Sequence, residues 1–138
     1  MKRREIFITQ FDKDRLEELI EVAEAFGDQG RKDLQDLQEE LDHAKIVQSK
    51  KVPSSVVTMN SRVLLLDVDT SEEMTYTLVF PKDADIDSGA ISVLAPIGTA
   101  ILGYSEGDVV EWEVPSGRRR ISIEKILYQP EAAGDYHL

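Results

Sequence analysis

Apolar residues recur every three or four positions in two segments near the start of the chain, which is the spacing of one face of an α-helix. The first stripe consists of Leu16, Leu19, Ala23 and Phe26. The second consists of Leu34, Leu37, Leu41 and Ala44. Because the glycine-containing segment 27–30 separates the two stripes, they predict a short antiparallel helical hairpin, a coiled coil paired along one apolar seam.

The start of the first helix carries local signals. Asp12 is predicted to be its N-cap, because a carboxylate there can accept hydrogen bonds from the free amides of the first turn. Phe11 and Leu16 stand where a hydrophobic staple would form, and the apolar run 6–8 is expected to pack at the base of the helix. Each arm of about 15 residues would be roughly 22 Å long.

Beyond Pro53 the apolar pattern changes to runs that are typical of β-strands. One short helix interrupts them over 96–102, since Pro96 suits a first helical turn and Gly103 suits the residue after a helix. The predicted strands cover residues 56–59, 63–66, 74–80, 91–94, 109–114 and 119–127. The fold class is therefore α+β, with a helical hairpin at 1–50 and an antiparallel-sheet domain at 51–138.

The charge and composition exclude several classes of function. The 138-residue chain has a formal net charge of −11, from 27 acidic and 16 basic residues, so we expect no independent binding to nucleic acid. Segment 12–45 alone holds 12 acids and 5 bases. An arm with this acidic charge could bind a basic surface. Equally, it could be a solvated helix pair whose charge only keeps the protein soluble.

The sequence also indicates a compartment. No apolar run approaches the ~20 residues that span a bilayer, and the N-terminus lacks the apolar stretch of a signal peptide. Cysteine is absent, which is compatible with a reducing environment. We therefore expect a cytoplasmic protein without a membrane partner.

Few side chains suggest chemistry of their own. His43 and His137 have no partners at metal-ligand spacing, so we assign no metal and no cofactor. The run 118–120, three arginines, either contacts nucleic acid or forms local ion pairs, which an acidic chain favours. Trp112 and Tyr104 either line a concave pocket or, as we expect, pack in the core.

Six short segments follow one another in an order that resembles the C-terminal domain of the bacterial Gre transcript-cleavage factors, a domain with an FKBP-like fold. They are Asp-Val-Asp-Thr-Ser-Glu-Glu (67–73), Tyr-Thr-Leu-Val (76–79), Ile-Ser-Val with Ala-Pro-Ile-Gly-Thr-Ala-Ile-Leu-Gly (91–103), Gly-Asp-Val-Val (107–110), Pro-Ser-Gly (115–117) and Ile-Glu-Lys-Ile-Leu-Tyr (123–128). Segment 57–61, Val-Thr-Met-Asn-Ser, and the tail 128–136 resemble the Rnk branch of this superfamily, the regulators of nucleoside diphosphate kinase. The tail either folds back on the domain or makes a second contact.

The resemblance implies a binding surface for RNA polymerase. In this superfamily the C-terminal domain grips the rim of the polymerase secondary channel, on the β′ subunit, while the coiled coil points inward. The matching rim-contact segment here is Leu94, Ala95, Pro96 and Ile97, although Leu94 and Ile97 also fit positions in the core. At the arm tip, Asp28 and Asp33 are either further contacts or part of a solvated loop.

The arm departs from the Gre pattern. Gre factors have a much longer coiled coil whose acidic tip helps to hold a catalytic metal ion at the polymerase active centre. Carboxylates assist metal-dependent hydrolysis only at coordination distance, and an arm of roughly 22 Å is not expected to bring Asp28 and Asp33 that far.

The resulting hypothesis is a monomeric, non-enzymatic transcription modulator that occupies the secondary channel and competes with Gre-type factors without stimulating cleavage. Three alternatives stay open. An FKBP-like fold allows a peptidyl-prolyl isomerase, although fold alone is a weak argument for activity. The arm tip allows a cleavage-stimulating elongation factor, and the Rnk resemblance allows a direct regulator of nucleoside diphosphate kinase.

Overall fold

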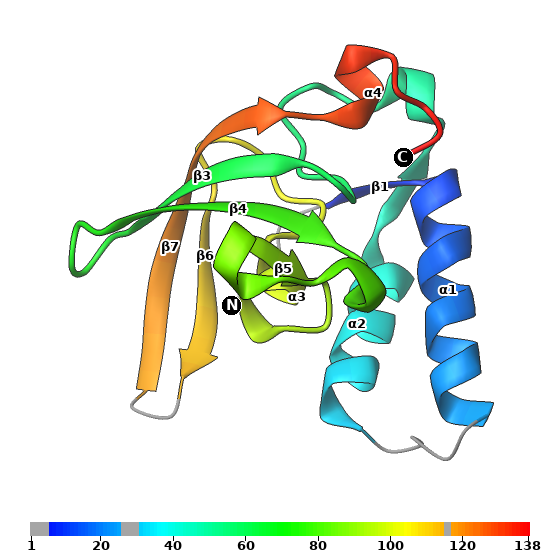
Figure 1. Cartoon of the computed structure of the whole chain (residues 1–138), viewed down its shortest axis with the longest axis horizontal. Coiled ribbons are helices and arrows are strands. Elements are labelled where there is room, and N and C mark those ends of the chain that lie inside the picture. Colours follow the sequence, from blue (N-terminus) through cyan, green and yellow to red (C-terminus); the bar gives the residue numbers. More distant parts are fainter. Residues whose placement is uncertain (1–5, 26–30, 115–116) are drawn as a thin grey trace.

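The computed structural model describes residues 6–25, 31–114 and 117–138. The fold is α+β: two helices, α1 (Gln10–Ala25) and α2 (Lys32–His43), lie side by side next to a five-stranded sheet (Figure 1). In this described part, no helix has both the length and the apolar composition that crossing a membrane requires.

The two predicted apolar stripes are buried. Leu16 on α1 and the three leucines of α2 are each at most 2% exposed, and Leu19, Ala23 and Ala44 pack against the same core. Ile20, which the prediction omitted, is also buried. Phe26 lies outside the described residues. Helical spacing therefore identified the correct faces of both helices.

The predicted start of α1 is wrong. The helix begins at Gln10, and the Thr9 hydroxyl accepts a hydrogen bond from the Asp12 amide at 3.0 Å. Asp12 is therefore inside the first turn, where its carboxylate is 1% exposed. The predicted staple is also wrong, because Phe11 is 38% exposed and stacks on the Arg15 guanidinium, 3.9 Å from the ring centre.

A short parallel sheet forms the base of the helix pair. β1 (Phe7–Thr9) pairs with β2 (Lys45–Val47), so the run 6–8 forms a strand rather than only packing against the helix. Parallel neighbours need a crossover connection, and α1 followed by α2 provides it by returning the chain to its starting end (Figure 1). The N-terminal part is therefore not all helical.

The larger sheet has the strand order β5-β4-β3-β7-β6. Its members are β3 (Arg62–Asp67), β4 (Glu73–Val79), β5 (Ala90–Ser92), β6 (Val109–Val114) and β7 (Gly117–Tyr128). Neighbouring strands are antiparallel except β4 and β5, which are parallel because the chain crosses back through the single turns η2 (Pro81–Asp83) and η3 (Ile86–Ser88). The prediction of an antiparallel sheet thus fails at this one edge.

Residues 56–59 do not form the predicted strand. Val56 makes only an isolated bridge to Ser105, while Val57 and Met59 are fully buried. Their apolar character reflects packing in the core rather than pairing in the sheet. The segment that precedes them contains one more single turn, η1 (Ser49–Lys51).

The helix α3 (Pro96–Ile101) confirms the predicted short helix and packs on β6. A Cβ atom on Gly98 would lie 2.3 Å from the Ser92 carbonyl oxygen, so only glycine fits there. Gly103, at φ +82°, accepts a hydrogen bond from the Phe7 amide at 3.1 Å and so joins the end of this segment to β1. A further helix, α4 (Pro130–Ala133), lies in the tail and was not predicted.

Substituting Gly98→Ala tests this close approach. Alanine forms helices better than glycine by about 1 kcal/mol, but the contact with the Ser92 carbonyl is expected to dominate and to cost about 1–3 kcal/mol in the free energy of unfolding. Urea denaturation measures the change. The control Ala100→Gly makes the opposite substitution in the same helix and should cost only about 1 kcal/mol. If Gly98→Ala instead stabilised the protein, the close approach of position 98 to the Ser92 carbonyl would be contradicted.

Candidate functional site

The segment predicted to contact a partner leads from β5 into α3. Pro96 is exposed, Leu94 and Ala95 are partly buried, and Ile97 is only 7% exposed and belongs to the core. The Leu94 amide donates to the Ser92 hydroxyl at 3.0 Å, which fixes the approach to the helix. The side chains available at this surface are therefore those of Leu94, Ala95 and Pro96.

Leu94 and Pro96 line a groove of about 460 Å³ between α2 and α3. The α3 side contributes apolar and small groups, and the α2 side contributes charged groups. The lining residues are Lys32, Asp33, Asp36, Glu39, Glu40, Leu94, Pro96, Thr99, Ala100 and Glu111. The structure thus brings Asp33, predicted at the arm tip, to the same groove as the predicted contact segment.

Five carboxylates and one lysine give the groove an acidic wall. Asp33 accepts two hydrogen bonds from Arg31, with its oxygens 3.0 Å from Nε and 2.5 Å from the nearer terminal nitrogen. These hydrogen bonds are the main reason that the pKa of Asp33 lies below its ordinary value. Lys32 pairs with Asp36 at 3.0 Å on the same helix. The groove therefore offers an apolar floor beside a row of acidic side chains, which suits a basic segment that carries apolar side chains.

Four of the acids in the groove were missed in the sequence analysis. Asp36, Glu39 and Glu40 follow Asp33 at intervals of three or four residues, so they lie on one face of α2. The helical spacing that identified the leucine face could therefore also have identified this acidic face. Glu111 comes from β6, and nothing in the sequence places it beside α2. Asp28 lies outside the described residues.

The other candidate residues have structural partners. Arg118, Arg119 and Arg120 form ion pairs with Glu111, Asp67 and Asp69 at 3.4, 2.7 and 2.8 Å, as expected for local pairing. Tyr104 is partly buried against the core, whereas the side chain of Trp112 lies outside the described residues. Over the described ranges, no three His, Cys, Asp or Glu side chains come together in a way that could hold a metal ion.

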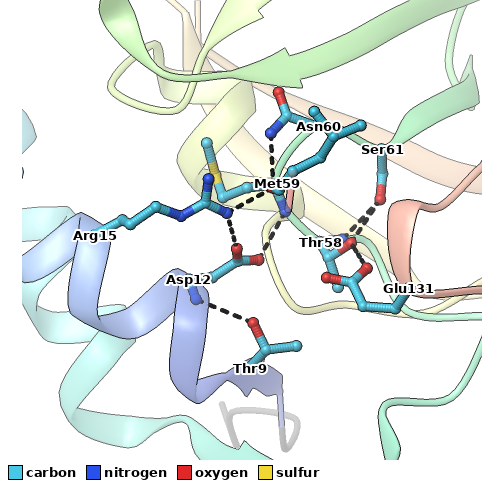
Figure 2. Close-up of polar contacts among 9 residues, drawn as sticks. Thr9, Asp12, Arg15, Thr58, Met59, Asn60, Ser61 and Glu131 are labelled. Atoms are coloured by element: carbon cyan, nitrogen blue, oxygen red, sulfur yellow. Dashed lines mark hydrogen bonds and ion pairs between the residues drawn. The ribbon is translucent and has the colours of Figure 1, made fainter. Parts of the chain in front are cut away.

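A buried polar cluster joins α1 to the rest of the molecule (Figure 2). The Asp12 carboxylate accepts a hydrogen bond from the Met59 amide at 3.0 Å and another from Arg15 at 2.5 Å. Arg15 also donates to the Leu138 carbonyl oxygen at 2.7 Å. We call this set of contacts, with those of residues 58–61 and the tail, the junction cluster.

The tail folds back and completes the junction cluster. The Thr58 hydroxyl donates its hydrogen to Glu131 on α4 at 2.7 Å and accepts from the Ser61 hydroxyl at 2.9 Å. The Asn60 side chain donates to the Leu138 carbonyl oxygen at 3.0 Å. Gln129 donates to the carbonyl oxygens of Pro53 and Val56 at 2.8 and 2.7 Å. Of the two possibilities that the sequence left open, folding back is therefore the one observed.

Two family models match the chain. The model described as "Transcription elongation factor, GreA/GreB, C-term" matches residues 52–128, and the model described as "Rnk N-terminus" matches residues 4–47. These two matches lie on the sheet and on the helix pair, respectively.

Similar proteins and structures agree with these matches. A protein of Escherichia coli K12 named "Regulator of nucleoside diphosphate kinase" is 38% identical over 139 residues, covering 100% of both chains. The transcription elongation factor GreA of Desulfotalea psychrophila is 38% identical over 93 residues, which are 67% of this chain and 58% of that protein. A GreA/GreB structure from Nitrosomonas europaea has a TM-score of 0.74 and 38% identity, covering 91% of this chain and 100% of that one.

Proposed function

The chain belongs to the family of GreA/GreB-type transcription factors, in the branch with an Rnk N-terminus, and we propose that it binds RNA polymerase at the secondary channel. In this proposal the protein is a non-enzymatic modulator that docks on the β′ rim, competes with Gre-type factors and does not stimulate transcript cleavage. It acts as a monomer in the cytoplasm, where its partner is found.

The observation that carries this proposal is the groove between α2 and α3. It joins the exposed Pro96 and the partly buried Leu94, both from the predicted contact segment, to the acidic wall of α2. A partner with basic and apolar side chains would bury the apolar floor while its charges meet the carboxylates. Attraction between opposite charges would also speed encounter with the partner.

The proposal assigns different roles to the two halves of the chain. We take α1 and α2 to be the short helical arm that points into the channel, and the five-stranded sheet with α3 to be the FKBP-like docking domain. At ~1.5 Å per residue the two helices, of 16 and 12 residues, are about 24 and 18 Å long. An arm of this length would occupy the entrance of the channel, but it would not bring its acidic side chains to the active centre of the polymerase.

Competition with a Gre factor tests the docking surface. The protein should displace a labelled Gre factor from core RNA polymerase, and Pro96→Asp should weaken displacement at least tenfold, about 1.4 kcal/mol, because it adds a charge to the apolar floor of an already acidic groove. Pro96 is exposed, so the fold should be retained; the buried Ile97 is unsuitable for this test.

The matched control is Pro81→Asp. Like Pro96, Pro81 is the first residue of a short helical segment, but it lines a different groove, beside α1 rather than α2. Its substitution should leave displacement unchanged. Equal losses in both variants, or no displacement by the unmodified protein, would contradict the proposed surface.

The absence of cleavage activity is tested on backtracked elongation complexes. We expect the protein to add no transcript cleavage above that of polymerase alone, because the arm is too short to bring Asp33 to the reacting phosphate, with a Gre factor as the positive control. Cleavage that disappears in the Asp33→Asn variant would instead identify a cleavage-stimulating factor.

A second candidate function is direct regulation of nucleoside diphosphate kinase. It is favoured by the name of the Escherichia coli relative, which matches along the full chain. Titration of the two purified proteins by calorimetry, without polymerase, separates this candidate from the first. If the protein binds nucleoside diphosphate kinase in this titration, and Pro96→Asp leaves the affinity unchanged, a direct regulator with a different contact surface is favoured.

A further inference from the structure

Grooves flank the helix pair on both sides. One groove, of about 460 Å³, separates α2 from α3. Another, of about 510 Å³, lies between α1 and the segment 80–82 and is lined by Leu19 and Val22, among others. Between these grooves the helices pack on the core through buried side chains such as Leu16, Ile20 and Leu34. Polar contacts at the base of the pair add to this apolar packing.

The junction cluster supplies polar contacts between the helix pair, the sheet domain and the tail. Asp12 and Arg15 are on α1, the Met59 amide belongs to the segment that leads into β3, and the Leu138 carbonyl belongs to the tail. Arg15 also stacks between two rings, 3.9 Å from Phe11 and 4.8 Å from Phe80 at the end of β4. Arg15 thus contacts both Phe80, which directly follows β4, and Leu138 of the tail.

The cluster buries two acids near a single arginine. Asp12 is 1% exposed and Glu131 is 7% exposed. The charged groups that act on Asp12 are Arg15 from its own helix and Glu131 from α4, while Thr9 and residues 58–61 contribute uncharged groups. Because burial disfavours an ionised carboxylate that is not fully compensated, this arrangement favours the uptake of one proton.

We propose that Asp12, Arg15 and the tail form a proton-responsive latch, which holds the helix pair against the sheet more tightly when Asp12 is protonated. In the neutral form, Asp12 loses the charge that attracts Arg15, but it can still accept from the Met59 amide, and both the cost of burying a charge and the repulsion from Glu131 are removed. The latch is a property of the free protein. Its consequence for function, control of the arm's position relative to the groove, rests on the proposed binding to polymerase.

The direction of the pH dependence follows from the environment of Asp12. Burial is the largest effect and, with Glu131, raises the pKa of Asp12 from 3.8 to about 6, against the opposing effects of the Met59 amide and Arg15. When the latch opens, the carboxyl group returns toward its ordinary pKa. The closed form therefore binds the proton more tightly, and closure strengthens as the pH falls from about 6 toward 3.8.

Amide hydrogen exchange of the full chain tests the latch. After correction for intrinsic exchange rates, the protection of the Met59 amide should be about tenfold higher at about pH 5 than at about pH 7.5, from the difference between the two pKa values. The Asp12→Asn variant keeps a carbonyl acceptor without an ionisable group, so its protection should not vary over this range. The control Asp14→Asn, at an exposed position on the same helix, should behave like the unmodified protein.

A further variant separates titration from a merely structural effect. Glu131→Gln keeps an acceptor for Thr58 but removes a charge that adds to the larger effect of burial in raising the pKa of Asp12, so the midpoint of the protection change should move to lower pH. Protection that is the same at both pH values in the unmodified protein, or an unchanged midpoint in Glu131→Gln, would overturn the proposal. Since these measurements use no polymerase, their failure would leave the proposed function standing.

Discussion

A carboxylate removed from water needs compensating hydrogen bonds, and Asp12 obtains them from parts of the chain that are distant in sequence. One oxygen accepts from the amide of Met59, 47 residues further along, and the other accepts from Arg15, which in turn binds the tail through Leu138. The burial of Asp12 is therefore compatible only with a structure in which the helix pair, the sheet and the tail are all in place. This constraint fixes the base from which both grooves open.

The groove between α2 and α3 depends on the same base. The end of α3 is joined to β1 through the hydrogen bond between Phe7 and Gly103, and β1 is paired with β2, which directly follows α2. At its other end, α3 approaches the Ser92 carbonyl as closely as glycine at position 98 allows. The acidic wall and the apolar floor are thus positioned by backbone contacts rather than by the charged side chains themselves.

The sequence predicted most of the fold but less of the site, and the reasons differ from residue to residue. The leucines of α2 were assigned correctly because helical periodicity is a local property. The pairing of β1 with β2 was missed because both strands are three residues long and depend on the intervening helices to bring them together. Asp12 was misassigned because an N-cap and a buried acid in the first turn look alike in sequence, and only the position of Met59 distinguishes them.

The two segments that resemble the Rnk branch are neighbours in space. Thr58 of segment 57–61 donates to Glu131 of the tail segment 128–136. The Gre-like segments lie mainly in the sheet and α3, and they and segment 57–61 all fall within the match to the GreA/GreB C-terminal model. Segment 57–61 and the tail thus meet where α1 joins the rest of the molecule, through the contact between Asp12 and Met59, and away from the proposed docking surface at α3.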